Sequence, residues 1–324
     1  MKLAILFSGQ GSQFTDMGLD FYQESPIFKD CVDKASEIAD FKITSVFAND
    51  GDKLSETKYI QPAIVAMSIG IWKMLQNTLG DKLAVEGMVG LSLGEYSALI
   101  ASQKLSFSDG MSVLKDRAIY MQDDANKVDS KMAAIIDPQI EVIEKLCTDY
   151  PNVYVANYNT PKQLVIGGDG EELVDVVDKI DSLNAAKKIV ELKVSGAFHT
   201  PLFTNASQKM KKKLSNVTFT EGSNLVVSNT TMRPFEKDSL AEILAKQIIK
   251  PTHFGECVQY LIDNKKIDTV LEIGPGKTLS KFTKQIDKSI KRYHISKLSD
   301  FKKFIDSVLS LIHISEPTRH SLIS

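Results

Sequence analysis

The chain has 324 residues, of which 43% are hydrophobic and 25% are charged, the balance of a globular protein with a large core. Its formal net charge of −2 argues against a nucleic-acid partner, which would need a basic surface. No apolar run is long enough to cross a membrane, and three scattered cysteines predict neither a disulfide framework nor a zinc site, which favours a cytoplasmic location.

The first predicted element is a strand at Leu3–Phe7, too short to be a signal peptide. A glycine-rich loop follows it. Gly9 and Gly11 begin a dinucleotide-binding pattern, but Phe14 replaces the third glycine, so the pattern is only weak evidence for a nucleotide site. Such a loop can instead donate a backbone N–H to an oxyanion.

A second strand, predicted at Val85–Val89, leads into the sequence GLSLG at residues 90–94, and residues 95–101 predict a helix. A G-x-S-x-G sequence between a strand and a helix is a nucleophile elbow, in which glycines relieve a crowded turn. Ser92 is therefore the candidate nucleophile. In sites of this kind one oxyanion donor is the N–H of the next residue, here Leu93.

Helices are also predicted at Pro62–Gln76 and Asp109–Gln122. The second carries an apolar stripe that includes Arg117. A buried guanidinium requires an anion, ideally one that accepts two hydrogen bonds. Two interpretations stay open at this point: an internal salt bridge to an Asp or Glu, or a carboxylate that belongs to a substrate.

Segment 127–195 has a different pattern of predicted elements, in the order βαββαβ of the ferredoxin-like unit. The predicted elements are a strand at Lys131–Ile136, a helix capped by Asp137 that ends at Thr148, strands at Val153–Asn157 and Gln163–Gly167, a helix at Glu171–Leu183 and a strand at Lys188–Val194. We expect a small domain inserted into a larger one, with the active site in the cleft between them.

His199 follows the last of these strands. Thr200 and Pro201 have the residue types of a helix N-cap and first position, so His199 is expected at a hinge beside the cleft. It is the candidate base for Ser92, and a hydrogen-bonded loop histidine is the alternative. No acidic residue stands out as the third member of a triad.

A backbone carbonyl offers another way to orient the histidine. The predicted helix Leu240–Lys250 meets Pro251, which has no N–H to donate to the carbonyl four residues earlier, that of Gln247. The freed carbonyl could accept a hydrogen bond from the imidazole Nδ1 of His199. Water or a 3₁₀ turn could also satisfy it.

Further strands are predicted at Asn224–Ser228, Thr269–Ile273 and Arg292–Ser296. The alternation of strands and helices predicts an α/β fold. We expect an α/β-hydrolase-like main domain with a parallel sheet at residues 1–126 and 196–311, and the ferredoxin-like insert at 127–195. Residues 312–324 lack a clear period and are predicted to be a non-native or disordered tail.

Seven motifs occur in order along the chain: FSGQGSQ (7–13), YIQPAIVA (59–66), GLSLGEYSAL (90–99), ANYNTPKQLVIGG (156–168), VSGAFHTPLF (194–203), QIIKP (247–251) and EIGPGKTL (272–279). Together they resemble the malonyl-CoA:acyl carrier protein transacylase family of type II fatty acid synthesis. The resemblance extends to about residue 310. Leu91 departs from it, because the family often has histidine before the nucleophile.

The resemblance implies a ping-pong transfer in which Ser92 takes malonyl from malonyl-CoA and passes it to the phosphopantetheine thiol of acyl carrier protein, with His199 as the base. It further implies that Arg117 binds the malonyl carboxylate and that the N–H groups of Gln10 and Leu93 form the oxyanion hole. The Gln247 carbonyl would orient His199. We expect a monomer without a metal or bound cofactor. A discrete polyketide acyltransferase and a serine thioesterase are the alternatives, although a thioesterase gives Arg117 no carboxylate to bind.

Overall fold

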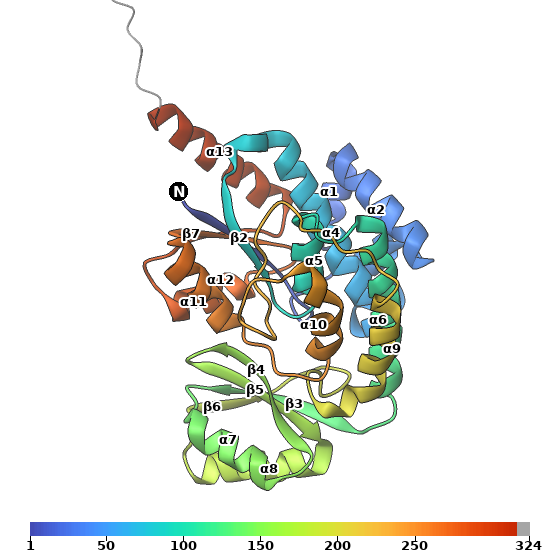
Figure 1. The fold of residues 1–324 in the computed structure, drawn as a ribbon, viewed down its shortest axis with the longest axis vertical. Coiled ribbons are helices and arrows are strands. Elements are labelled where there is room, and N and C mark those ends of the chain that lie inside the picture. Colours follow the sequence, from blue (N-terminus) through green and yellow to red (C-terminus); the bar gives the residue numbers. More distant parts are fainter. Residues whose placement is uncertain (316–324) are drawn as a thin grey trace, which may run out of the picture.

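The computed structural model describes residues 1–315, which form two separate β-sheets surrounded by helices (Figure 1). The larger unit contains a parallel sheet of four strands in the order β2-β1-β7-β8. Its strands are β1 (Leu3–Phe7), β2 (Val85–Gly90), β7 (Thr269–Ile273) and β8 (Lys291–Ile295). All residues of β1 and β7 are buried, as expected for parallel strands covered on both faces.

Helices cover both faces of this sheet. Its N-terminal and central helices are α1 (Leu19–Glu24), α2 (Pro26–Ala39), α3 (Ile43–Phe47), α4 (Thr57–Leu79), α5 (Gly94–Ala101) and α6 (Phe107–Ala125). The later ones are α9 (Thr204–Leu214), α10 (Leu240–Gln247), α11 (Phe254–Lys265), α12 (Thr278–Ile286) and α13 (Leu298–Ser315). Short 3₁₀ helices are η1 (Asp50–Ser55), η2 (Gly80–Lys82), η3 (Pro201–Phe203) and η4 (Lys237–Ser239). Alternate residues of β1 enter different cores: Ile5 and Phe7 join the larger, whereas Ala4 and Leu6 join the one beside α11.

The second sheet, below the first in Figure 1, is antiparallel with the order β4-β5-β3-β6. It consists of β3 (Ser130–Ile136), β4 (Val153–Thr160), β5 (Gln163–Asp169) and β6 (Lys188–Glu191). Helices α7 (Ile140–Asp149) and α8 (Gly170–Ser182) cover its outer face and enclose a separate small core. The βαββαβ order and antiparallel pairing are those of a ferredoxin-like unit, so the predicted fold class is confirmed.

Two local predictions were wrong. Asn224–Ser228 is not a regular strand: it meets the sheet only through an isolated bridge between Met88 and Val226, because the chain turns at Ser228, whose N–H bonds the carbonyl of Arg233. Asp137 does not cap a helix, since it adopts a left-handed φ of 47° and the helix begins at Ile140. Thr200 and Pro201 do hold the N-cap and first helical positions, as predicted, but the first turn is the 3₁₀ helix η3 and the Thr200 hydroxyl donates to Ala197 instead of capping it.

The last predicted strand of the insert is also shorter than expected. β6 ends at Glu191, and residues 192–195 form an irregular segment that leads back to the larger unit. At the C-terminus, residues 312–315 continue α13, and the rest of the predicted tail lies outside the described residues. Within residues 1–315, none of the helices combines the length and the hydropathy that a membrane crossing needs.

Candidate active site

Ser92 lies on a tight turn between β2 and α5, with a φ of 51°. A Cβ at Gly90 would lie 1.9 Å from the carbonyl carbon of Gly94, and a Cβ at Gly94 would lie 2.1 Å from the carbonyl oxygen of Phe7. Only glycine fits at either position, which is the geometry of a nucleophile elbow. The Ser92 N–H donates to Asn229 Oδ1 at 2.8 Å, which helps to hold the strained turn.

His199 is held through one ring nitrogen. Its Nδ1 lies 2.8 Å from the carbonyl oxygen of Gln247, where α10 ends four residues before Pro251. A carbonyl only accepts hydrogen bonds, so Nδ1 carries the proton and Nε2 is left with its lone pair, the form that can act as a base. His199 and Ser92 line the same cavity, of about 420 Å³, together with Gln10, Leu93 and Arg117.

Arg117 is only 1% exposed and its contacts are mostly neutral. One terminal nitrogen donates to Gln61 Oε1 at 2.6 Å, and the other donates to Gln247 Oε1 at 3.1 Å and to Ser92 Oγ at 3.5 Å. The guanidinium also lies over the ring of Tyr96, 5.4 Å from its centroid. No carboxylate in the described part of the chain comes within ion-pair distance, so the internal salt bridge considered above does not form there. The Arg117 guanidinium beside Ser92 could therefore bind an anion.

The backbone N–H groups of Gln10 and Leu93 form no hydrogen bond within residues 1–315, and both residues line the cavity with Ser92. Gln10 lies after β1 and Leu93 directly follows the nucleophile. Two free N–H donors beside a serine could bind a developing oxyanion.

Sequence reasoning missed three residues that support this site: Gln61, Glu95 and Asn229. Glu95 is fully buried; one of its carboxylate oxygens accepts from the N–H of Asn229 and the other from Nε2 of Gln247. Gln247 Nε2 also donates to the Ser92 carbonyl at 2.9 Å, which leaves Gln247 Oε1 to face Arg117. Glu95 thus fixes the orientation of the amide that contacts the arginine. A carboxylate in the wholly buried helix α5 was the available signal.

Burial is the main influence on the pKa values of Glu95 and His199. It raises the pKa of Glu95 to about 8 against the opposing effect of its hydrogen bonds. It lowers the pKa of His199 to about 4; the Gln247 carbonyl opposes that shift, and the charge of Arg117 reinforces it. His199 is therefore neutral over the whole physiological range.

A first prediction concerns pH. Only the neutral imidazole accepts a proton, and the lowered pKa keeps His199 neutral on acidification. We therefore expect kcat/KM to stay level from about pH 7, where Glu95 with its pKa of about 8 is already protonated, to about pH 5. An unperturbed histidine, with a pKa of ~6.5, would give a decline centred there. Initial rates in overlapping buffers would test this, and a midpoint at 6 to 7 would contradict it. Between about pH 6.5 and about pH 4 the unfolded chain binds a proton at this histidine and the folded chain does not. The contribution of His199 to the free energy of unfolding therefore falls as the pH falls through this range.

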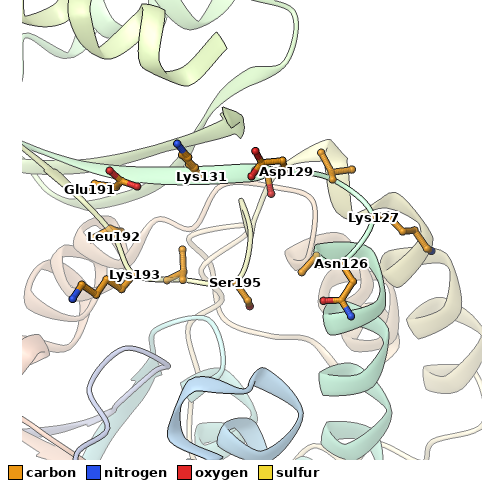
Figure 2. Close-up of a pocket in the computed structure, with 12 residues that line it drawn as sticks. Asn126, Lys127, Asp129, Lys131, Glu191, Leu192, Lys193 and Ser195 are labelled. Atoms are coloured by element: carbon orange, nitrogen blue, oxygen red, sulfur yellow. The ribbon is translucent and has the colours of Figure 1, made fainter. Parts of the chain in front are cut away.

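A larger cavity, of about 780 Å³, lies beside the active site and is lined by the two segments that connect the sheets, residues 125–131 and 191–195 (Figure 2). It contains neither Ser92 nor His199. Leu192, Lys193 and Val194 line both cavities, so this irregular segment separates them.

Comparison with known proteins gives a consistent result. The family model of the acyl transferase domain matches residues 5–300. The malonyl CoA-acyl carrier protein transacylase of Bacillus subtilis is 34% identical over 301 residues, 91% of this chain and 93% of the relative.

Solved structures agree. The crystal structure of MCAT from Streptococcus pneumoniae is 37% identical, with a TM-score of 0.89 over 94% of this chain and all of that chain. A malonyl-transacylase in complex with a type II PKS acyl-carrier protein is 27% identical, with a TM-score of 0.89 over 95% of this chain and all of that chain.

Proposed function

This chain belongs to the malonyl-CoA–acyl carrier protein transacylase family, as its motifs predicted, and we propose that Ser92 is the residue that carries the malonyl group. The chain is an acyl carrier protein S-malonyltransferase of fatty acid synthesis. In the first half-reaction Ser92 Oγ attacks the carbonyl carbon of the malonyl-CoA thioester, while His199 Nε2 takes the proton of the serine hydroxyl. The tetrahedral intermediate then collapses, the C–S bond breaks and coenzyme A leaves as a thiol with the proton from His199.

The second half-reaction is the same chemistry with a different nucleophile. The phosphopantetheine thiol of acyl carrier protein gives its proton to His199 and attacks the malonyl ester. Ser92 leaves and recovers the proton. In both halves the N–H groups of Gln10 and Leu93 stabilise the oxyanion, and the Gln247 carbonyl keeps His199 in the required tautomer.

The observation that carries this proposal is the buried guanidinium of Arg117, which lies 3.5 Å from Ser92 Oγ with no anionic partner in residues 1–315. Malonyl-CoA has a free carboxylate at the far end of its acyl group, which matches this charge. A thioesterase that cleaves a neutral acyl chain would leave Arg117 unpaired in a buried site, at considerable cost.

Mass spectrometry of the intact protein after mixing with malonyl-CoA provides the test. We expect a mass increase of one malonyl group, located on Ser92 by peptide mapping, absent from Ser92→Ala and discharged on addition of holo acyl carrier protein. Lack of the adduct, or its loss to water at the same rate without the carrier, would exclude this transfer mechanism.

A polyketide carrier is the second candidate acceptor, because a similar structure is a complex with a type II PKS acyl-carrier protein. Discharge rates with a fatty acid carrier and a polyketide carrier would separate the two.

We also propose that the enzyme is cytoplasmic and works as a monomer. Its three free cysteines support a reducing compartment. Analytical ultracentrifugation would test whether it is a monomer.

We propose the domain division 1–126 with 196–311, and 127–195. It is supported by the two sheets and by a hydrophobic core confined to the insert. Residues 125–131 and 191–195 would then be the connections between the two domains.

A further inference from the structure

Thr57 is a fully buried hydroxyl residue at the first position of α4. Its Oγ1 lies 3.2 Å from Gln10 Nε2 and 3.0 Å from Ser195 Oγ. Three segments that are far apart in the sequence therefore meet at one side chain. The amide nitrogen of Gln10 can only donate, so the Thr57 oxygen accepts from it, and in the bond with Ser195 either hydroxyl can be the donor.

Each partner of Thr57 is close to part of the catalytic apparatus. Gln10 supplies a free backbone N–H to the cavity, and Ser195 precedes His199 by four residues. Ser195 ends the irregular segment 192–195 that separates the two cavities, and its side chain points away from β3 (Figure 2).

Other hydrogen bonds tie this segment and the residues after it to the insert. The Leu192 N–H donates to the Met132 carbonyl at 2.9 Å, and the Ala197 N–H donates to Ser130 Oγ at 3.0 Å. Within residues 1–315, the bond from Ser195 to Thr57 is the one hydrogen bond from segment 192–195 to the larger unit. Leu192 and Val194 also pack against the main core, and the bond from Ser195 to Thr57 adds the polar contact that holds the end of the segment beside the larger unit.

We propose that Thr57 is a positioning residue that couples the oxyanion loop at Gln10 to the segment leading to His199. The role rests on the proposed function, since Thr57 acts through the oxyanion donor and the base. The Gln10 N–H receives the negative charge of the oxyanion and His199 receives the proton in the same step. That step requires the two groups to be aligned within a fraction of an ångström, and the Thr57 hydroxyl fixes the distance between them.

Thr57→Val tests this proposal, because valine has the shape of threonine without its hydroxyl. We expect kcat for malonyl transfer to fall about tenfold while KM changes less than twofold, because Arg117 and the substrate contacts stay in place. Thr57→Ser keeps the hydroxyl and should restore most of the rate. The selectivity for malonyl-CoA over acetyl-CoA should not change.

Ser195→Ala removes the other partner from a half-buried position, so it serves as a second probe if Thr57→Val folds poorly. It should lower kcat by a similar factor, and the double variant should be no worse than either single variant. A wild-type kcat in Thr57→Val or Ser195→Ala, or equal loss in Thr57→Val and Thr57→Ser, would overturn the coupling. The Ser92 adduct of the unmodified enzyme is measured alongside, so failure of the proposed function would be seen separately.

Discussion

Replacing His199 with alanine is expected to slow malonylation of Ser92 by about 10²–10⁴-fold, the usual contribution of a positioned general base. Without the imidazole, the serine hydroxyl must lose its proton to water, which is a much weaker base than a neutral imidazole. The free N–H groups of Gln10 and Leu93 remain, so some acylation should persist. The measurement is the rate of adduct formation by quenched mixing with malonyl-CoA and mass spectrometry.

His294 provides the matched control. It lies in β8, its side chain is 38% exposed, and it lines no part of the catalytic cavity. His294→Ala should acylate at the wild-type rate. If His199→Ala also acylates at that rate, another group is the base, and the contact between His199 and Gln247 is structural.

Local chemistry explains why the tight turn at Ser92 and the contact between His199 and Gln247 could be predicted from the sequence. A Cβ at Gly90 would clash with Gly94 in the same turn, and Pro251 lacks an N–H whatever the tertiary structure. The Gln247 carbonyl therefore needed an external donor, and the imidazole of His199 lies 2.8 Å from it. The signals at Gly90 and at Pro251 each depend on residues within four positions, whereas the clash at Gly94 involves the distant Phe7.

Partners that meet only in the tertiary structure gave no such signal. Asn229 contacts Ser92 across 137 positions, and it follows a segment that we predicted as a strand because its residues are apolar. Gln61 lies in an otherwise apolar stretch of α4, where its periodicity is that of a core residue. A buried amide has the same local pattern whether it contacts an arginine, a backbone group or water.

Arg117 shows what the sequence could predict and what it could not. Its place on the apolar stripe of α6 predicted burial, which the structure confirms, but periodicity could not decide between an internal acid and a substrate. The nearby acid, Glu95, is used differently: its oxygens accept from the Asn229 N–H and the Gln247 amide, so it reaches Arg117 only through Gln247.

Replacing Arg117 with alanine should lower kcat/KM for malonyl-CoA by about 10²-fold or more, because loss of one partner from a buried, hydrogen-bonded charge pair usually costs ~2–5 kcal/mol. Acetyl-CoA has no second carboxylate and loses no such contact. Its use relative to malonyl-CoA should therefore rise in the variant. Steady-state kinetics with both donors, on the same preparation, gives this ratio.

Acetyl-CoA is also the internal control for folding, since a distorted elbow would slow both donors together. Arg117→Lys separates charge from geometry: an ammonium keeps the positive charge but cannot contact Gln61, Gln247 and a carboxylate with the planar fork of a guanidinium. We expect it to lie between alanine and arginine in selectivity. Equal losses for malonyl-CoA and acetyl-CoA in both variants would mean that Arg117 supports the elbow through its contacts with Ser92 and Gln247 and does not bind the malonyl carboxylate.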